Sequence, residues 1–141
     1  MIHLKEVDEY NWRLDLQVSE EQQKYVSSSF KLLARAWAYR HHRSCPLVIY
    51  DDETPVGMCL YYDLGQSYDF SQLFIDQRYQ RKGYGHAAVE LVLRRMREDG
   101  RYQKVYTCFV EGNDSARRPY EAFGFVVTDF SDGEYVMERN L

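Results

Sequence analysis

A short basic stretch with two glycines, residues 80–85 with the sequence Gln-Arg-Lys-Gly-Tyr-Gly, lies between two apolar segments. The apolar run before it, 72–76, predicts a strand, and the apolar periodicity after it, 84–99, predicts a long helix. The first turn of a helix offers unpaired N–H groups and partial positive charge, and glycine lets an anion approach the backbone. Arg81 and Lys82 add two full charges. This combination predicts a phosphate-binding loop.

Three kinds of phosphate loop compete for this stretch. The triphosphate pattern G-x-x-x-x-G-K-[ST] is absent from the sequence. Residues 83–88 fit the dinucleotide pattern G-x-G-x-x-[GA], but residues 76–82 separate them from the strand, where a dinucleotide loop turns at once. The third pattern, [QR]-x-x-G-x-[GA], is matched by residues 80–85 and fits best. A dinucleotide-binding domain stays an alternative.

The composition excludes several other kinds of chemistry. The net charge is −4 and no basic face stands out, which argues against a nucleic-acid partner. No apolar run approaches the roughly 20 residues of a membrane span. Cys45, Cys59 and Cys108 are widely spaced without a C-x-x-C pair, so neither a zinc site nor a disulfide framework is expected. We therefore expect a reduced, cytoplasmic protein that binds no metal.

The remaining patterns describe the elements that must position this loop. Apolar runs predict strands at 2–7, 46–50, 56–62, 68–76, 104–110, 125–127 and 134–138. Helical spacing predicts helices at 9–17, 30–38, 84–99 and 115–123, and a capping-box pattern at Ser19 and Gln22 opens another that runs to Val26. The predicted order is β-α-α-β-β-β-α-β-α-β-β. In this order the two helices after the first strand are 19–26 and 30–38. Residues 1–141, without a linker, are expected to form one α/β domain.

Four stretches of the chain resemble the GNAT superfamily of N-acetyltransferases. They are residues 74–85, 111–117, 120–125 and 16–26. The third reads Tyr-Glu-Ala-Phe-Gly-Phe and is similar to the family's Y-x-x-x-G-F. The fourth, together with residues 132–137, resembles bacterial spermine/spermidine (diamine) N-acetyltransferases in particular. Because the predicted order of elements is also the family's order, the resemblance spans nearly the whole chain.

This resemblance implies both a fold and a reaction. The fold is that of acyl-CoA N-acyltransferases, a mixed and mostly antiparallel sheet flanked by helices. The reaction is acetyl transfer from acetyl-CoA to a primary amine of a small molecule, by direct attack in a ternary complex and without a metal. A polyamine such as spermine or spermidine is the leading acceptor. Relatives of this kind are often dimers, so a homodimer is implied as well.

The resemblance also assigns roles to individual residues. The expected cofactor-binding residues are Leu73, Phe74, Ile75, Gln80, Arg81, Lys82, Gly83, Tyr84, Gly85, His86 and Asn113. The main chain of 73–75 is expected to bind the pantetheine arm, and 80–85 with the amide of His86 the pyrophosphate, while Asn113 faces the pantetheine or a water. Tyr120 is the expected catalytic residue. A phenol, with a reference pKa of about 10, can protonate the leaving thiolate.

The acceptor side of the site is less defined. Gln72 and Glu111 are expected to face the amine, with Glu111 as the nearest candidate base in sequence, acting through a water. The related enzymes usually carry an aromatic or acidic residue and an arginine where this chain has Ser71 and Gln72. Another amine, such as an amino sugar, an amino acid or a protein N-terminus, is an alternative acceptor, and a non-catalytic acyl-CoA-binding module is an alternative function. Pro119 predicts that the helix carrying Tyr120 is short, kinked or late in starting.

Overall fold

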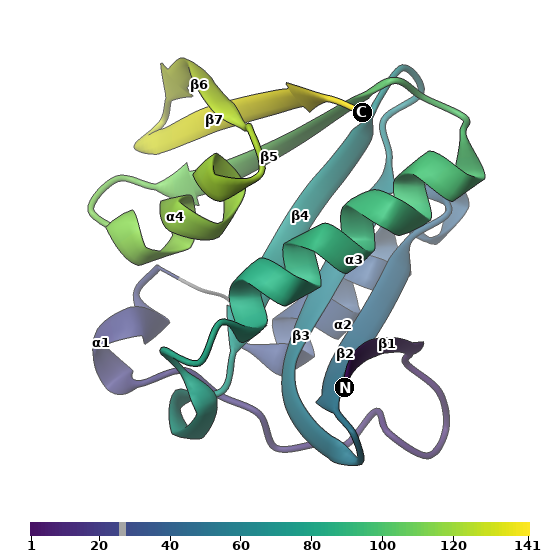
Figure 1. Cartoon of the computed structure of the whole chain (residues 1–141), viewed down its shortest axis with the longest axis vertical. Coiled ribbons are helices and arrows are strands. Elements are labelled where there is room, and N and C mark those ends of the chain that lie inside the picture. Colours follow the sequence, from purple (N-terminus) through teal and green to yellow (C-terminus); the bar gives the residue numbers. More distant parts are fainter. Residues whose placement is uncertain (26–27) are drawn as a thin grey trace.

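The computed structural model describes residues 1–25 and 28–141. Its strands form one seven-stranded sheet in the order β1-β2-β3-β4-β5-β7-β6 (Figure 1). The strands are β1 Ile2–Glu6, β2 Cys45–Asp51, β3 Thr54–Asp63, β4 Tyr68–Ile75, β5 Lys104–Val110, β6 Val126–Ser131 and β7 Glu134–Asn140. The helices are α1 Glu20–Gln23, α2 Ser29–Ala38, α3 Tyr84–Asp99 and α4 Asp114–Ala122, with 3-10 turns at Arg40–His42 and Gln77–Tyr79. The predicted order of strands and helices is confirmed.

Helices cover both faces of the sheet. The apolar stripe of α3, which includes Val89 and Val92, packs in one core cluster with Phe70 and with Tyr120 of α4. A second cluster, on the opposite face, joins Leu32 of α2 to alternate residues of the central strands. Figure 1 shows the same arrangement, with α3 in front of the strands and α2 behind them. We call these the α3 face and the α2 face.

The centre of the sheet opens at β4 and β5, the one parallel pair among the described strands. These strands are paired at three positions only, of which the last joins Phe70 to Thr107. Beyond it residues 71–75 of β4 and 108–110 of β5 have no register with each other, and the two strands diverge (Figure 1). Close to the same point, the pairing of β4 with β3 shifts by one residue at a bulge. Bulges of this kind redirect side chains and are frequent beside active sites.

The helix predicted at 9–17 is wrong. Asp8 and Asn11 close a turn instead, because the Asp8 carboxylate accepts hydrogen bonds from the N–H groups of Tyr10 and Asn11. The Asn11 side chain accepts a bond from the Asp8 N–H in return. Such side-chain bonds give the backbone an alternative to a helix.

The capping prediction holds only in part. Ser19 precedes α1 as its N-cap residue, but its side chain makes no capping hydrogen bond. The helix is one turn long and ends at Gln23. The predicted end of this helix, at Val26, lies outside the described residues.

Gly57 allows β3 to lie against β4 where β4 approaches the expected cofactor site. A Cβ added to Gly57 would lie 2.3 Å from the carbonyl oxygen of Phe74, a backbone atom that cannot move aside alone. We therefore expect Gly57→Ala to lower the free energy of unfolding by about 2–3 kcal/mol, the upper range for an overpacked site. The melting temperature should fall by roughly 5–10 °C.

Gly85→Ala provides the matched control for this substitution. It adds the same methyl group to another glycine without a positive φ, where the nearest atom, Cγ of Pro119, lies at an ordinary contact distance of 3.5 Å. We expect its melting temperature to stay within a few degrees of the wild type. Equal stability of the two variants in thermal denaturation would contradict the role assigned to Gly57.

Candidate active site

Tyr120 lies where β4 and β5 separate. Its ring is buried, with 4% of the residue exposed, and packs edge-on against Phe70 and Phe125 with ring centroids 5.4 and 5.3 Å away. Phe70 and Thr107 form the last paired position of the two strands. Burial raises the pKa of Tyr120 well above its ordinary value, and a hydrogen bond with the Thr107 hydroxyl offsets only part of this. The phenol is therefore protonated at neutral pH, the state that a proton donor needs.

Pro119 is accommodated by a short α4 that packs against α3. The helix has nine residues and contains Pro119 close to its end, as the sequence predicted for a short helix. The position of a Cβ on Gly85 is 3.5 Å from Pro119 Cγ and 4.0 Å from Ile75 Cγ1. Gly85 was expected to make room for a phosphate. The structure shows that a Cβ at this position would also be in ordinary contact with α4, the helix that holds Tyr120 at the divergence of the strands.

Gly83 and Arg81 shape the loop before α3. Both have positive φ, +81° and +65°, and they flank Lys82. When left-handed and right-handed residues alternate, successive N–H groups point toward one side of the backbone. This arrangement makes a concave anion site. A Cβ at Gly83 would have no atom within 4 Å, so the space beside the backbone is open.

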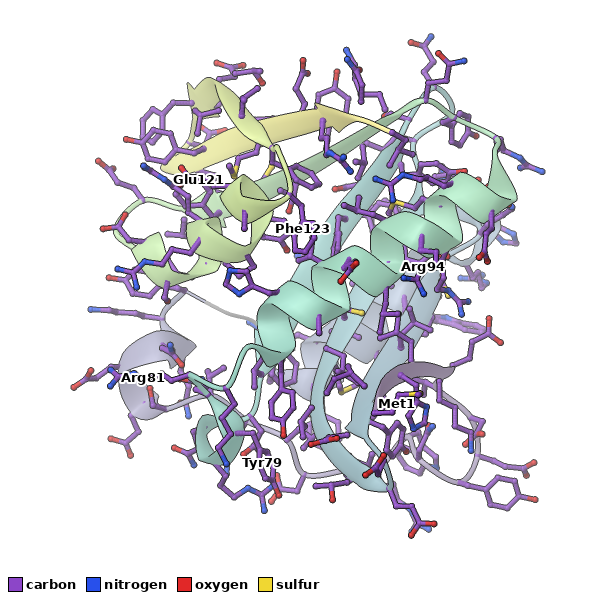
Figure 2. All side chains as sticks on the ribbon, viewed as in Figure 1. Met1, Tyr79, Arg81, Arg94, Glu121 and Phe123 are labelled. Atoms are coloured by element: carbon purple, nitrogen blue, oxygen red, sulfur yellow. The ribbon has the colours of Figure 1, made fainter. Side chains whose placement is uncertain are left out.

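The start of α3 adds further donors to this concave loop. The first helical hydrogen bond runs from the Ala87 N–H to the Gly83 carbonyl oxygen, 3.1 Å, so the N–H groups of residues 84–86 have no acceptor within the helix. Within residues 1–25 and 28–141, neither Arg81 nor Lys82 forms an ion pair. Both side chains are exposed. In Figure 2 the labelled Arg81 stands at the loop between the 3-10 turn Gln77–Tyr79 and α3 and points away from the sheet. These features fit a diphosphate.

Hydrogen bonds made by the side chains of Gln80 and Tyr84 fix the shape of the loop. The Gln80 amide donates hydrogen bonds to the Ile75 carbonyl oxygen, 3.0 Å, and to the side-chain oxygen of Gln22, 2.8 Å. The Tyr84 hydroxyl donates to Asp51 at the tip of the β2–β3 hairpin, 2.6 Å. Gln80 and Tyr84 can therefore contribute to a phosphate site only through their main chains. The His86 ring is exposed, on the first turn of α3.

Leu73, Phe74 and Ile75 occupy the part of β4 that has separated from β5. Their pairing with β3 is intact, and their other edge has no strand partner among the described residues. The side chains of Leu73 and Ile75 pack on the α3 face, and Phe74 packs on the α2 face. An exposed strand edge presents N–H and C=O groups to an extended ligand with amide groups, as the pantetheine arm is.

Asn113 is buried at the start of α4. Its side-chain oxygen accepts a hydrogen bond from the Ser115 hydroxyl, 3.1 Å. The preceding residue, Gly112, lies under Tyr25, whose hydroxyl would be 3.1 Å from a Cβ at that glycine. The segment after α1 thus contacts the β5–α4 turn, and Asn113 lies beside this contact.

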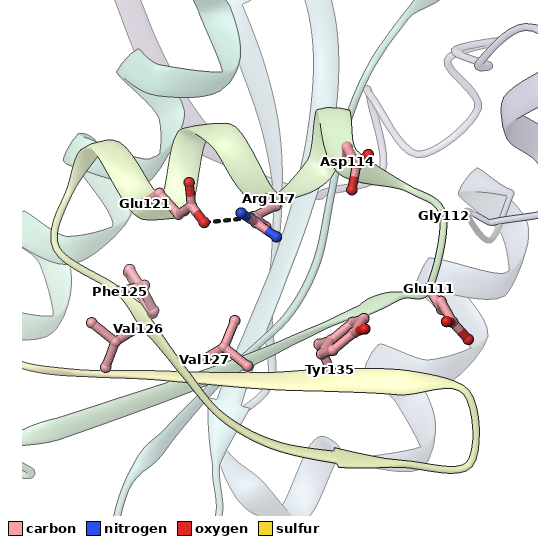
Figure 3. A pocket seen from close by; sticks show the side chains of 9 residues that line it. All are labelled: Glu111, Gly112, Asp114, Arg117, Glu121, Phe125, Val126, Val127 and Tyr135. Atoms are coloured by element: carbon pink, nitrogen blue, oxygen red, sulfur yellow. Dashed lines mark hydrogen bonds and ion pairs between the residues drawn. The ribbon is translucent and has the colours of Figure 1, made fainter.

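Glu111 does not join the other predicted residues. It is exposed, and it lines a hollow of about 770 Å³ between α4 and the β6–β7 hairpin. Figure 3 shows this hollow, with Arg117 and Glu121 of α4 forming an ion pair above Val127 and Tyr135. The hollow does not include Tyr120 or the edge of β4. Cys108 of β5 is exposed as well.

Asp69 of β4 is a residue that the sequence patterns did not single out. It is the position before Phe70, and it is paired with Tyr62 of β3 and Tyr106 of β5. An acidic residue between the buried Tyr68 and Phe70 is a signal that could have found it, because strand interiors carry few carboxylates. Gln72, which was predicted to face the acceptor, lies past the bulge on the same strand.

Metal-ligand clusters and membrane-spanning helices are both absent from the described part of the chain. Among the described residues, no group of three or more His, Cys, Asp or Glu side chains is placed to hold a metal ion. In the same part of the chain, no helix is long and apolar enough to cross a membrane.

Comparison with known proteins identifies the family. The model of the acetyltransferase (GNAT) family matches residues 7–125. The chain belongs to the GNAT family of acetyltransferases. The resemblance seen in the sequence is confirmed, and so is the expected fold, a mixed and mostly antiparallel sheet with helices.

Similar proteins include enzymes that act on different amines. A spermine/spermidine N(1)-acetyltransferase of Bacillus subtilis is 31% identical over 140 residues, covering 91% of this chain and 90% of the relative. The spermidine N-acetyltransferase of Vibrio cholerae, solved with CoA and spermine, superposes with a TM-score of 0.77 at 19% identity, covering 99% of this chain and 95% of that one. The ribosomal-protein-S18-alanine N-acetyltransferase of Escherichia coli gives 0.75 at 16%, with 99% and 94% covered. At these identities the two structures show the shared GNAT fold alone.

Proposed function

We propose that this GNAT acetyltransferase transfers the acetyl group of acetyl-CoA to a primary amine of a polyamine such as spermine or spermidine. The observation that carries the proposal is the 31% identity to the Bacillus spermine/spermidine enzyme, which extends over 91% of this chain. The Vibrio structure adds that a protein of this fold binds CoA and spermine together. A mildly acidic protein, with a net charge of −4, also suits a polycationic substrate.

The proposed cofactor site runs from the phosphate loop along the free edge of β4. The concave loop at Arg81–Gly83 and the free N–H groups of residues 84–86 would hold the diphosphate, and the main chain of 73–75 would hold the pantetheine arm. This path leads to the point where β4 and β5 diverge. Asn113 lies on the β5 side of the same opening.

The proposed chemistry requires a neutral amine, a polarised carbonyl and a proton for the leaving sulfur. When bound, acetyl-CoA supplies an activated acetyl group. A main-chain N–H of β4 near the bulge can donate to the carbonyl oxygen as negative charge develops there. Tyr120 gives its phenolic proton to the thiolate. Holding the two substrates together in the opening supplies the rest of the rate enhancement.

The first experiment measures CoA release from acetyl-CoA with a panel of amines. The panel contains spermine, spermidine and putrescine beside an amino sugar, free amino acids and an N-terminal alanine peptide. We expect polyamines to give the highest kcat/KM, because the proposal assigns them as acceptors. Turnover of another amine alone would show that the acceptor is not a polyamine, while the acetyl-transfer reaction of the family would stand. Tight binding of CoA without turnover of any amine would favour a binding module.

The oligomeric state is a separate prediction. We expect a homodimer, on the basis of the resemblance to dimeric relatives. Light scattering coupled to size-exclusion chromatography measures the mass in solution against the 16.9 kDa of one chain. A mass of one chain at micromolar concentration would contradict this prediction.

A further inference from the structure

Gln22 of α1 completes the capping-box pattern in the sequence, but its side chain bonds to the loop before α3. Its oxygen Oε1 accepts a hydrogen bond of 2.8 Å from Nε2 of Gln80, a residue 58 positions further along the chain. The same Nε2 donates to the carbonyl oxygen of Ile75, 3.0 Å away, at the end of β4. Both hydrogens of the Gln80 amide are therefore used, and this side chain joins α1 to the end of β4.

Two anchors hold α1 beside this loop. On one side, the Gln17 N–H donates to the Asp76 carboxylate, 3.0 Å, and the Gln77 N–H donates to the Gln17 carbonyl oxygen, 2.9 Å. On the other side, Tyr25 lies over the β5–α4 turn, with its hydroxyl 3.1 Å from the position of a Cβ on Gly112. Figure 1 shows α1 between α4 and the turn that precedes α3. A helix of one turn is not stable in isolation, so these contacts fix the position of α1.

The first anchor is a buried carboxylate that serves both segments at once. Asp76 has 1% of its surface exposed. Besides the Gln17 N–H, it accepts hydrogen bonds from the N–H of Arg78, 2.9 Å, and from Nε of the same arginine, 2.8 Å. One side chain thus fixes the segment before α1 and the first turn after β4 relative to each other, and the bond from Gln80 to Gln22 extends this connection to α1 itself.

The loop that begins at Gln80 has a backbone that needs support from its surroundings. Arg81 follows Gln80 directly and has a φ of +65°, a left-handed conformation that is unfavourable for a residue with a Cβ. Such a conformation persists only where neighbouring contacts hold it. The two bonds of the Gln80 side chain fix the residue just before this point. A loop that is already in its binding conformation binds its ligand more tightly, because less conformational entropy is lost on binding.

We propose that Gln22 is a positioning residue of the cofactor site. It holds the side chain of Gln80, and through Gln80 it holds the loop at Arg81–Gly83 in the conformation that binds the diphosphate of CoA. The inference rests on the proposed cofactor site and does not depend on which amine is acetylated. Gln22 acts through another residue and not on the reacting atoms. Its loss therefore weakens the binding of CoA and leaves the acetyl-transfer step itself unchanged.

The test replaces Gln22 by methionine, which has a similar length and no amide group. In calorimetric titration with CoA, we expect the Kd of Gln22→Met to rise by about three- to tenfold, the range for loss of one hydrogen bond. The KM for acetyl-CoA should rise by the same factor, while kcat at saturating acetyl-CoA stays within about twofold of the wild type. Gln22 is only half-buried, so the melting temperature without CoA should stay within a few degrees of the wild type.

A double-mutant cycle separates this role from a general effect on α1. Gln80→Met removes the partner of Gln22 together with the bond to Ile75, so it should weaken CoA binding by itself. In this background, Gln22→Met should cause no further loss of affinity, because the bond between the two side chains is already absent. A residue that merely stabilised α1 would lower the affinity by the same factor in both backgrounds.

Gln23→Met is the matched control for this test. Gln23 is the next residue of α1, and its side chain donates a long bond of 3.5 Å to the Val18 carbonyl oxygen within the same segment. We expect this variant to bind CoA as the wild type does. A wild type that binds no CoA would overturn the proposed cofactor site. If the wild type binds CoA, an unchanged Kd in Gln22→Met, or an equal loss with and without Gln80, would overturn the role of Gln22 alone.

Discussion

Tyr120→Phe is expected to lower kcat by about 10²–10⁴-fold, the range for loss of a general acid, while the Kd of CoA stays unchanged. The substitution removes only the hydroxyl, and the ring keeps its edge-on contacts with Phe70 and Phe125. Without the phenolic proton, the sulfur must leave as an unprotonated thiolate. Single-turnover measurement of CoA release, with CoA binding measured by calorimetry, checks both parts of the prediction.

Tyr68→Phe is the matched control for this variant. Tyr68 is also a buried tyrosine whose ring packs on the α3 face of the sheet. Its hydroxyl donates hydrogen bonds to the Met96 carbonyl oxygen and to Asp99, at the C-terminal end of α3 and away from the opening. We expect this variant to lose about 1–3 kcal/mol of stability and to keep its kcat. An unchanged kcat in Tyr120→Phe would remove Tyr120 from the mechanism.

The pH dependence of kcat gives an independent check on Tyr120. Burial raises the pKa of Tyr120 above its ordinary value of about 10, so the phenol stays protonated throughout the neutral range. A donor must be protonated to act. We therefore expect no loss of kcat from this group as the pH rises toward 9. An alkaline limb near neutral pH that disappears in Tyr120→Phe would contradict the raised pKa.

The features that the sequence predicted well depend on local patterns. The helix 84–99 and the strand 104–110 have the predicted bounds, because each has a regular apolar period and is followed by a turn. Gly100 ends α3 with a φ of +68°, the left-handed conformation expected of a glycine after a helix. The phosphate-binding role of residues 80–85 also comes from local features, two glycines and two cations before a helix, and it stays a prediction.

The features that the sequence missed depend on contacts between distant segments. The helix predicted at 9–17 gave way to a turn around Asp8. In the extended segment after it, Leu16 and Val18 are buried in one cluster with Leu32 of α2. The bulge in β4 arises from the pairing with β3, and no local pattern announces it. Glu111 was chosen as the nearest candidate base in sequence, and the fold turns it toward the hollow beside α4. The position of Asp69 next to the divergence of β4 and β5 follows from the pairing of the strands and from no local pattern.

Gly85 belongs to a motif whose structural role was inferred only in part from the sequence. Its position in the loop suggested that a phosphate needs the space. The structure places Pro119 and Ile75 beside it, at ordinary contact distance from a Cβ at this position, so α3 and α4 pack against each other next to the loop. The motif thereby links the cofactor loop to the helix that carries Tyr120, a connection between residues far apart in sequence.

Gly83→Glu is the second variant for which we expect a large effect, a loss of CoA affinity of roughly 10²–10³-fold. The new side chain has room, since no atom lies within 4 Å of the Cβ position, so the fold should persist. Its carboxylate would stand at the N-terminus of α3, where the diphosphate is proposed to bind. Two unit charges 4 Å apart repel by about 4 kcal/mol at an effective dielectric constant of 20. Calorimetric titration with CoA at low and high salt measures this, and the loss should shrink as salt screens the charges.

Gly65→Glu separates this electrostatic effect from backbone strain. Gly65 also has a positive φ, +87° against +81° for Gly83, and also has no atom within 4 Å of its Cβ position. It lies in the β3–β4 turn, at the opposite end of β4 from the loop. Both variants therefore carry the same strain and the same added charge, and they should lose similar stability, about 1 kcal/mol. Only the variant at Gly83 should lose CoA binding. If both variants bind CoA as the wild type does, the diphosphate does not bind at the start of α3, and the path along the edge of β4 must be assigned again.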